Sequence, residues 1–400
     1  MAYNARVLVI ENLDDAKRAL REIKVDRAGV GIMGLKSLFR AVKAHGVDAR
    51  AANILKQEFL ARGGEVGVAH DAVTLATKTT DVILLGTDKQ FAALIKKLKT
   101  QPFGLKKLAD EVRDALAAFD SRAKDIVWDR YRVPLSERTC VMGVLNVTPD
   151  SFSDGGRFFD KKTAVAHAIQ MVEDGADIID IGGESTRPSA EPVSEEDEKK
   201  RVLPVIDKLA GQIGVPISID TYKTGIARAA LDAGAAMVND ISGLSFDPEM
   251  AGLAAARKTP VVIMHMQGTP RNMQKNPRYE SLIGEITGFL SGRAEAAESA
   301  GVAADRIIID PGIGFGKTVE HNLEIVKRLK EFTSLGYPVM IGVSRKSFIG
   351  KVLGTEVDER LEGTSAAVAC SVIGGASLVR VHDVKEMFRV TRLADAVKQI

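Results

Sequence analysis

Residues 140–156 read CVMGVLNVTPDSFSDGG and join two unlike halves. The first half, residues 140–145, is a continuous apolar run of the kind that forms a strand buried on both faces. The second half is polar, rich in turn formers and closed by two glycines, so it predicts an irregular loop. A loop that places Asn146 and Phe152 directly after a buried strand is either a solvated surface segment or one that organises around a ligand.

The same transition recurs along the rest of the chain. Each further apolar run ends in a polar or glycine-rich turn and is followed by a segment with apolar residues at helical spacing. The eight runs are 141–145, 177–181, 216–220, 236–240, 261–265, 306–310, 338–342 and 377–381. Strands that alternate with helices predict parallel βαβ units. Eight units in roughly 250 residues favour a (β/α)8 TIM barrel over a doubly wound open sheet.

A smaller N-terminal α/β domain is predicted to precede the barrel. Its expected strands are 5–10 and 81–87, and its expected helices are 14–23, 49–64, 88–100 and 104–119. We place the domain boundary near residue 125, with 1–125 as the first domain and 126–400 as the barrel. Trp128 and Tyr131 are expected to close the floor of the barrel. The role of residues 1–125 stays open between packing support, gating of the barrel and docking to another enzyme.

Composition indicates a globular protein without an extended nucleic-acid surface. The 400 residues are 45% hydrophobic and 27% charged, with a net charge of +2. The sequence shows neither a signal-peptide pattern nor an apolar run near the ~20 residues of a membrane span. Both cysteines, Cys140 and Cys370, lie in apolar runs, which predicts packing instead of disulfides or nucleophilic chemistry. We predict a cytoplasmic protein with no membrane and no nucleic-acid partner.

Polar residues follow the apolar runs in register. The carboxyl ends of the strands of a barrel meet on one face, and active sites are built there. The residues in these positions are Asn146, Thr186, Arg187, Pro188, Asp220, Asn239, Asp240, His265, Asp310, Ser344, Arg345, Lys346, Arg380 and His382. Together they predict a ligand pocket at that end of the barrel.

Two chemical features of this pocket follow from residue type. Arg380 and His382 are two apart on a strand and therefore point the same way, so with Ser344 and Arg345 they predict a cationic site for a phosphate or carboxylate. A surface salt bridge is the alternative for Arg380.

The second feature is a pair of carboxylates. Asp220 and Asp310 each close an apolar run, where an unpaired carboxylate is costly. A carboxylate accepts two parallel hydrogen bonds, which suits the NH–C–NH2 edge of an aminopyrimidinone ring. Helix N-capping is the alternative, above all for Asp220, because a helical segment follows it.

The glycine-rich stretch PGIGFGKT, residues 311–318, does not match a Walker phosphate loop, because Pro311 stands where the first glycine is required. It fits better as a loop that admits a flat ligand close to the backbone. No zinc-like histidine spacing is present. Asn146, with Asp150 and Asp154, offers hard oxygen ligands that suit Mg²⁺ held jointly with a substrate phosphate. A solvated loop is the alternative for the two aspartates.

These motifs together resemble the successive signatures of the dihydropteroate synthase family. The matching stretches are MGVLNVTPDSFSDGG (142–156), GADIIDIGGESTRP (175–188), ISIDTYK (217–223), VNDISG (238–243), IMHMQGTP (263–270), DPGIGFGKT (310–318), GVSRKSFIG (342–350) and VRVHDV (379–384). The resemblance covers about residues 128–400 and leaves the N-terminal domain outside it.

The resemblance implies a transferase of folate biosynthesis. It implies a (β/α)8 barrel that joins 6-hydroxymethyl-7,8-dihydropterin pyrophosphate to p-aminobenzoate by a new C–N bond, with Mg²⁺ as cofactor and sulfonamides as competitors. Both substrates are small molecules, and a homodimer is a further expectation of the family.

The resemblance also implies a role for each matching residue. The implied metal ligand is Asn146. The implied pterin and pyrophosphate contacts are Thr186, Asp220, Asn239, Asp310, Lys346, Arg380 and His382. The implied p-aminobenzoate contacts are Phe152, Pro188, Ser344 and Arg345, and the implied catalytic residues are Asp154, Lys346, Arg380 and His382.

Two other functions stay open on sequence grounds. A methyltetrahydrofolate–corrinoid methyltransferase shares a pterin-binding barrel but needs neither a metal–pyrophosphate loop nor the Ser344-Arg345-Lys346 turn, and a cobalamin difference spectrum would identify it. A catalytically silent pterin-binding scaffold is the other, and a turnover assay would identify that.

Overall fold

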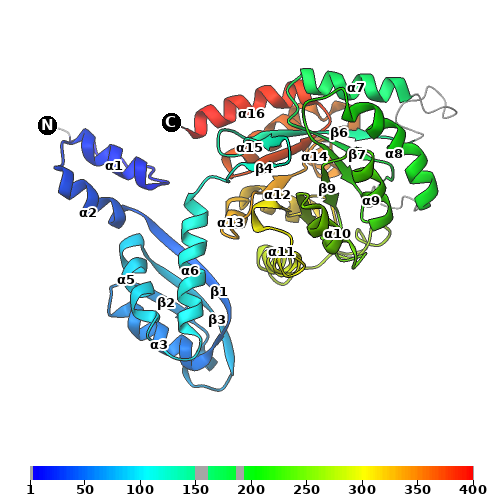
Figure 1. The fold of residues 1–400 in the computed structure, drawn as a ribbon. Coiled ribbons are helices and arrows are strands. Elements are labelled where there is room, and N and C mark those ends of the chain that lie inside the picture. The colour runs from blue at the N-terminus through cyan, green and yellow to red at the C-terminus, as the bar shows by residue number, and fades with distance from the viewer. Residues whose placement is uncertain (1–2, 149–160, 186–192, 400) are drawn as a thin grey trace. The chain divides into compact units, whose positions relative to one another are not determined.

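The computed structural model describes residues 3–148, 161–185 and 193–399. The chain forms two compact units, Met1–Asp120 and Ser121–Ile400, which Figure 1 colours from blue to red along the chain. The first unit thus ends a few residues before the predicted boundary. No helix in the described ranges is both long enough and apolar enough to cross a membrane.

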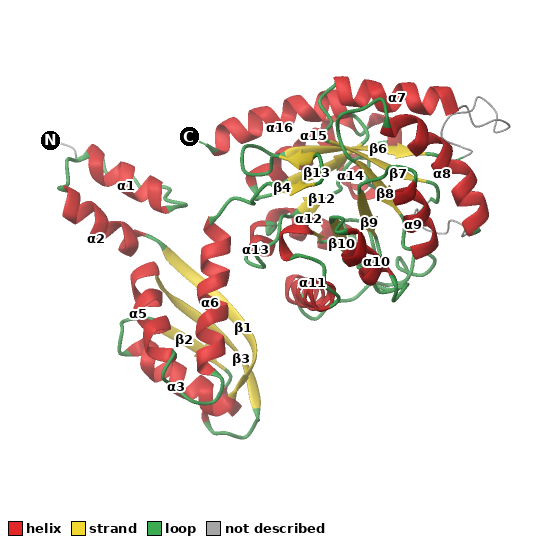
Figure 2. Ribbon diagram, in the orientation of Figure 1, coloured by secondary structure: helices red, strands yellow, loops and turns green. Residues whose placement is uncertain are grey.

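The first unit contains a small antiparallel sheet covered by helices. Its elements are α1 (Leu13–Glu22), α2 (Arg27–Ser37), β1 (Phe39–Asp48), α3 (Ala49–Leu60), β2 (Glu65–Val68), α4 (His70–Val73), β3 (Thr79–Thr87), α5 (Asp88–Leu98) and α6 (Leu105–Asp120). The strands, yellow in Figure 2, run in the order β1-β3-β2. Val82 and Leu84 are buried whereas Ile83 between them is exposed, so only one face of the sheet packs against the core formed by α3, α5 and α6.

The strand predicted over residues 5–10 is wrong. Residues 5–10 have no regular secondary structure, and the side chains of Val7 and Val9 are 95% and 82% exposed. An apolar run forms a strand only where a neighbouring strand can pair with it, and here the partner of β3 is β1 instead.

The second unit begins with a hairpin whose Trp128 and Tyr131 close the barrel floor, the position predicted for these two residues. The hairpin strands are β4 (Ile126–Trp128) and β5 (Tyr131–Val133). Trp128 Nε1 donates a hydrogen bond to the carbonyl of Ala236 at 2.9 Å, and the Trp128 and Tyr131 ring centroids lie 5.6 Å apart. Both rings pack against the lowest apolar side chains inside the barrel.

The eight predicted barrel strands are all present. They are β6 (Cys140–Asn146), β7 (Ile178–Gly182), β8 (Ile217–Asp220), β9 (Met237–Asp240), β10 (Val261–Met264), β11 (Ile307–Asp310), β12 (Met340–Ile341) and β13 (Leu378–Val381). In the described residues they form one sheet of parallel strands in the order β11-β10-β9-β8-β7-β6-β13-β12. A parallel bridge between Ile309 and Val339 joins the two ends of that sheet and closes the barrel, which confirms the predicted α/β fold.

Helices follow the strands and surround the barrel (Figure 1). The α-helices are α7 (Lys161–Glu173), α8 (Glu195–Ala210), α9 (Thr224–Asp232), α10 (Met250–Arg257), α11 (Leu282–Ser299), α12 (Val319–Lys327), α13 (Lys330–Thr333), α14 (Ser347–Leu353), α15 (Leu361–Ile373) and α16 (Val384–Lys398). Two short 3-10 helices, Ala304–Arg306 and Val357–Glu359, complete the described elements.

Strand alternation divides the barrel interior into an apolar floor and a polar layer above it. On β7, Ile179 and Ile181 face the helices, whereas Ile178 faces the floor cluster. Residues two apart on a strand share a face, so Asp180 faces the interior one layer above Ile178. The floor residues of the other strands include Met142, Met237, Val262, Ile308, Met340 and Leu378. The residues two positions later are Val144, Asn239, Met264, Asp310, Gly342 and Arg380.

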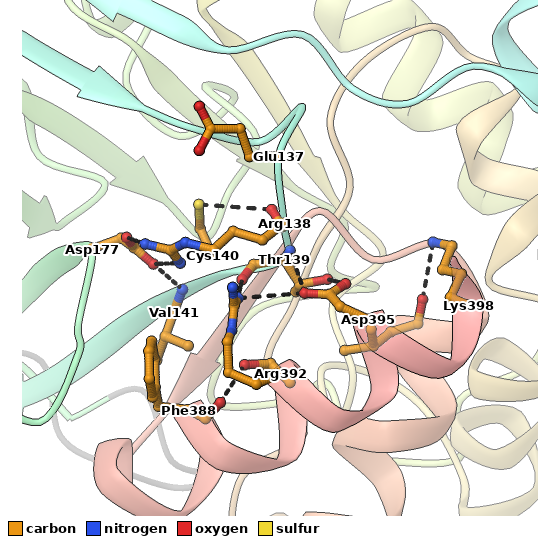
Figure 3. Close-up of polar contacts among 12 residues, drawn as sticks. Glu137, Arg138, Thr139, Cys140, Val141, Asp177, Phe388, Arg392, Asp395 and Lys398 are labelled. Atoms are coloured by element: carbon orange, nitrogen blue, oxygen red, sulfur yellow. Dashed lines mark hydrogen bonds and ion pairs between the residues drawn. The ribbon is translucent and has the colours of Figure 1, made fainter. Parts of the chain in front are cut away.

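The entry to β6 is tied to the C-terminal helix by a polar cluster (Figure 3). Thr139 donates its N–H to Asp395 Oδ2 at 2.9 Å and its hydroxyl to Asp395 Oδ1 at 2.8 Å. Arg392 Nη2 donates to the Thr139 carbonyl at 2.6 Å, and Arg138 Nη1 donates to Asp177 Oδ2 at 2.7 Å. The bonds of Asp395 and Arg392 to Thr139 hold α16 at the entry to the first barrel strand, and the Arg138–Asp177 pair ties the same entry to the residue before β7.

The two cysteines differ in their surroundings. Cys140 is fully buried, and burial raises the pKa of its thiol far above the ordinary value, so it is inert packing as predicted. Cys370 is exposed on α15. The prediction that Cys370 is a packing residue is therefore wrong, because its position on the helix points outward.

Candidate functional site

A pocket opens at the carboxyl ends of the barrel strands, directly above the apolar floor. Its polar lining residues are Asp220, Asn239, Asp310, Ser344, Lys346, Arg380 and His382. Its apolar lining residues are Val144, Ile241, Met264, Ile313, Phe315, Met340 and Gly342. All seven polar residues were predicted from the sequence as site residues, and the fold brings them together from different strands.

Arg380 links two carboxylates across the pocket. Its Nε donates to Asp180 Oδ2 at 2.6 Å and its Nη2 donates to Asp220 Oδ2 at 2.7 Å. Asn239 Nδ2 donates to the same Asp180 oxygen at 3.0 Å. Arg380 is thus part of a buried network inside the barrel, which rules out the surface salt bridge considered above. Burial raises the pKa of Asp220, and the nearby Arg380 guanidinium opposes that rise.

Two polar atoms of this network lack partners. Asp180 Oδ1 and Asn239 Oδ1 are buried and have no hydrogen-bond partner in the part of the chain that the structure describes. Buried acceptors without partners are uncommon and call for a ligand or water. Asn239 lines the pocket, so its Oδ1 is an acceptor for a ligand that carries an N–H or O–H donor.

The two predicted carboxylates do not cap helices. Asp310 Oδ1 accepts a hydrogen bond from the Gly312 N–H at 2.7 Å within the turn that follows β11. The N-cap of α9 is Lys223, not Asp220. Burial raises the pKa of Asp310, whereas Lys346, Lys317 and Arg380 act to lower it. The capping alternative is therefore wrong for Asp220, and both carboxylates face the pocket.

Lys346 lies against the glycine-rich loop that follows β11. Its Nζ is 4.3 Å from the centre of the Phe315 ring, an arrangement of the cation–π type. Burial, together with the charge of Arg380, lowers the pKa of Lys346 to about 8. Gly312 has φ +70°, and a Cβ there would lie 1.9 Å from the His265 carbonyl oxygen, so only glycine lets this loop approach the end of β10.

His382 and Ser344 form a hydrogen-bonded pair. The His382 N–H donates to Ser344 Oγ at 3.2 Å, and Ser344 Oγ lies 3.0 Å from His382 Nδ1. Burial and the charges of Arg380 and Arg345 lower the pKa of His382 to about 3. If Ser344 donates to Nδ1, the neutral ring carries its proton on Nε2. In that tautomer His382 presents a neutral donor beside Arg380, which suits an anionic group.

Arg345 does not join the pocket. Its backbone has φ +56°, and its Nε donates to Asp383 Oδ2 at 3.0 Å. This conformation turns the guanidinium toward Asp383, so Arg345 is not among the lining residues. The sequence interpretation grouped it with Ser344 and Lys346 because it lies between them, but neighbours in a turn need not point the same way.

Asn146 ends β6 at the same end of the barrel as the pocket, although it is not a lining residue. A Cβ placed on Gly182 would lie 3.7 Å from Asp220 Oδ2 and 3.8 Å from Asn146 Oδ1. The two oxygens therefore flank the same glycine. Asp240 and His265, which were also predicted, are buried but do not line the pocket. The other predicted site residues lie outside the described ranges: Asp150, Phe152, Asp154, Thr186, Arg187 and Pro188.

Asp180 and Phe315 are among the residues of the site that the sequence interpretation missed. Asp180 is fully buried and holds Arg380 and Asn239, but it lies in the middle of an apolar run instead of at its end. The signal was available, because a carboxylate inside such a run requires a buried partner. Phe315 forms part of the pocket wall, and its place between two glycines of a βα loop gave no comparable signal.

Comparison with known proteins agrees with this geometry. Residues 142–382 match the family described as pterin binding enzyme. A dihydropteroate synthase of Synechocystis sp. is 50% identical over 262 residues, which are 65% of this chain and 91% of that protein. A probable bifunctional folylpolyglutamate synthase/dihydropteroate synthase of Halobacterium salinarum is 42% identical over 390 residues. That match takes in 97% of this chain, including the first unit, and 46% of the relative, so this chain spans about half of its length.

A solved structure gives the same result. The dihydropteroate synthase of Xanthomonas albilineans in complex with 7,8-dihydropteroate superposes with a TM-score of 0.61 at 41% identity, covering 67% of this chain and 97% of that one. The chain therefore belongs to the pterin-binding enzyme family, among the dihydropteroate synthases, and carries an additional N-terminal α/β segment.

Proposed function

We infer that the pocket above the barrel floor is where this chain carries out the dihydropteroate synthase reaction. The reaction joins 6-hydroxymethyl-7,8-dihydropterin pyrophosphate to p-aminobenzoate and gives 7,8-dihydropteroate and pyrophosphate. The observation that carries this conclusion is the arrangement of Asp220, Asn239 and Asp310 on one part of the pocket lining, with Lys346, Arg380 and His382 completing it. The half-identical relative from Synechocystis supports the same reaction.

We assign the pterin ring to the acidic part of the pocket. The ring offers N–H donors along its aminopyrimidinone edge, and carboxylates and an amide oxygen are the matching acceptors. Asp310 keeps one oxygen on the Gly312 N–H, and its other oxygen makes no hydrogen bond with the residues that the structure describes, so it is available to the ring. Asn239 Oδ1 is likewise available. Phe315 and Met264 supply apolar surface for the flat faces of the ring.

We assign the pyrophosphate to Arg380 and His382. The C–O bond between the pterin methylene and the pyrophosphate breaks, the oxygen keeps the electron pair, and the cationic centre that forms is delocalised into the electron-rich ring. The amine nitrogen of p-aminobenzoate then forms the C–N bond and gives up one proton. The Arg380 guanidinium and the neutral Nε2–H of His382 stabilise the charge that develops on the leaving oxygen.

This chemistry needs orientation more than a protein nucleophile. Lys346 and the pterin carboxylates fix the ring, which holds the methylene in position for attack. Lys346 has a lowered pKa of about 8, so near neutral pH it still carries its charge for most of the time. Its ammonium adds to the positive charge that the leaving pyrophosphate meets.

The described residues fit a magnesium ion held jointly with the substrate. Mg²⁺ is commonly bound by one or two protein oxygens together with substrate phosphates and water. Asn146 supplies such an oxygen at the mouth of the barrel, whereas no cluster of three metal-ligating side chains is found within residues 3–148, 161–185 and 193–399. We propose that Asn146 holds the ion, which when bound supplies charge neutralisation for the pyrophosphate.

A direct test incubates the full chain with the pterin pyrophosphate, p-aminobenzoate and Mg²⁺, and measures dihydropteroate and pyrophosphate. Equal amounts of the two products are expected. Release of pyrophosphate without dihydropteroate would show hydrolysis instead of transfer and would overturn the proposal. Arg328→Met is a suitable control, because Arg328 makes only surface ion pairs with Glu324 and Glu331 on α12 and α13.

The homodimer and the cytoplasmic location stay predictions. Light scattering of the purified chain at several concentrations tests the first, and fractionation of cells tests the second.

A further inference from the structure

One ammonium group lies where three elements of the barrel rim meet. Lys223, at the start of α9, donates to Glu184 Oε2 at 2.5 Å, to the Val193 carbonyl at 2.7 Å and to Glu198 Oε2 at 2.7 Å. A lysine ammonium has three N–H donors, so every donor of Lys223 has a partner. Glu184 follows β7, whereas Val193 and Glu198 belong to the start of α8 and the residues just before it.

The cluster is largely shielded from solvent although its three side chains are ionisable. The side chains of Lys223, Glu184 and Glu198 are 15%, 11% and 1% exposed. Burial raises the pKa of Glu198, and the neighbouring Lys223 opposes that rise. Buried ion pairs lose hydration when they form and add little net stability compared with apolar packing. Such pairs instead hold the elements that carry them in a defined geometry, so the role of this cluster depends on which elements it joins.

The three acceptors lie at the two ends of the connection from β7 to α8. Glu184 is at the beginning of that connection and Val193 is at its end, so a single side chain fixes both ends. Arg201 of α8 adds a second tie, since its Nη1 donates to the Gly183 carbonyl at 2.8 Å. The connection leaves β7 at its carboxyl end, which is the end of the barrel where the pocket opens.

Tyr222 joins the same cluster to the pocket wall. Its hydroxyl donates to Glu184 Oε1 at 2.9 Å. Its ring packs against the apolar cluster that contains Ile241, Met264 and Phe315, three residues of the pocket lining. The ends of the β7–α8 connection are therefore held in a fixed relation to the wall against which the pterin is assigned.

We propose that Lys223 is a positioning residue for the transfer reaction. By fixing both ends of the β7–α8 connection relative to the pocket, it sets the alignment of p-aminobenzoate with the pterin methylene. Lys223 does not line the pocket, so it acts through Glu184 and Val193 and touches neither substrate. The expected effect on turnover rests on the proposed function, whereas the expected effect on the ends of the connection does not.

The test compares Lys223→Met with Lys200→Met. Met keeps most of the length of the side chain and removes the charge. Lys200 is a matched control because it is 64% exposed and pairs with Glu196 on the outside of α8. Hydrogen–deuterium exchange of peptides from 183 to 198 reports on the ends of the connection. Calorimetry with the free pterin reports on the pocket, and steady-state turnover reports on the reaction.

The proposal predicts a localised effect. Exchange in Lys223→Met rises in peptides from 183 to 198 and stays unchanged in the floor hairpin around Trp128. The value of kcat/KM for p-aminobenzoate falls by about 100-fold, the loss that a misplacement of ~1 Å causes near reacting groups. Pterin affinity stays unchanged, since Asp220, Asn239 and Asp310 lie outside the connection. Lys223→Arg, which can still donate to both carboxylates, recovers part of the loss.

Two results would overturn the proposal. One is unchanged exchange together with unchanged turnover in Lys223→Met. The other is faster exchange throughout the barrel with an equal loss of pterin affinity, which would mean that the cluster only supports the fold. If Lys223→Met does not fold, the same measurements are made on Glu184→Gln. This variant weakens the contact of Lys223 with the beginning of the connection only. An inactive wild type would refute the proposed function, while the exchange measurement would still decide the positioning role.

Discussion

Replacing Arg380 with Met should destabilise the barrel mainly through the carboxylates that it leaves behind. In the wild type, Arg380 donates to Asp180 at 2.6 Å and to Asp220 at 2.7 Å. Asp180 is fully buried, and one of its oxygens already lacks a partner in the described residues. Met fills most of the side-chain volume, so packing changes little. The variant instead contains two carboxylates whose shared cation is gone.

The expected loss follows from the cost of such an unpaired charge. Breaking a buried ion pair by removing one partner costs about 3–5 kcal/mol, a large part of the ~5–15 kcal/mol that stabilises a typical domain. An isolated buried carboxylate also has its pKa raised above the ~3.9 of the unfolded chain. The folded variant then binds a proton that the unfolded chain does not, so its stability rises as pH falls. The loss relative to wild type should therefore be smaller at about pH 5.5 than at about pH 8.

The chain offers a local probe for this measurement. Trp128 is its only tryptophan and lies 6% exposed in the barrel floor, so tryptophan fluorescence during urea denaturation follows the second unit. Adding Asp180→Asn to Arg380→Met should recover part of the lost stability, because it removes the fully buried charge. Arg328→Met, which breaks only surface pairs, should cost no more than ~1 kcal/mol.

Two outcomes would refute the reasoning. The first is a loss of stability in Arg380→Met that is the same at both pH values. The second is a double variant no more stable than the single one. Either would mean that lost packing, and not an unpaired Asp180, explains the effect.

Three further predictions concern single residues. In the wild type, kcat/KM should fall through about pH 8 because Lys346 loses its proton there. Lys346→Arg should move this fall to higher pH, and a fall at the same pH would contradict the prediction. Lys317 is 3% exposed, and burial lowers its pKa from 10.5 to about 7. Between pH 7 and 10.5 the unfolded chain therefore binds a proton that the folded chain does not, so the free energy of unfolding should rise with pH in this range. Denaturation of Lys317→Met should lack that rise, and an identical pH trend in both proteins would argue against it. Asn146→Ala should weaken Mg²⁺-dependent pyrophosphate binding more than binding of free pterin in calorimetry, and equal losses would refute the metal role.

The barrel could be predicted from the sequence because its strands are buried on both faces. Such strands appear as continuous apolar runs, and no knowledge of their neighbours is needed to recognise them. The position of Trp128 and Tyr131 at the floor was predicted, since large aromatic side chains just before the first strand need a place to be buried, whereas the hairpin that carries them was not predicted. In the first unit the sheet has one open face, so β1 (FRAVKAHGVD) alternates weakly and was missed, while residues 5–10 gave an apolar run without a strand.

The site was predictable where a polar residue ends a strand and not where it lies within one. Asp220, Asn239 and Asp310 were found by this rule, and the structure places all three in the pocket. Asp180 was missed because the sequence of β7 alone does not show which of its side chains point into the barrel. That choice is set by the register of the strand in the sheet. Arg345 was misplaced because a positive φ and the partner Asp383, 38 positions away in the sequence, decide where its side chain lies.

The most direct test of the central claim is turnover measured side by side for the wild type, Asp310→Asn and Asp305→Asn. Asp310 faces the pocket, whereas Asp305 lies in the short 3-10 helix before the same strand, β11, and serves as the matched control. The wild type and Asp305→Asn should form dihydropteroate from the pterin pyrophosphate and p-aminobenzoate at equal rates. Asp310→Asn should lose about 10- to 150-fold in kcat/KM, since a hydrogen bond to a charged group contributes ~1.5–3 kcal/mol. Absence of product from the wild type, or undiminished turnover in Asp310→Asn, would contradict the claim that this pocket is the pterin site of a dihydropteroate synthase.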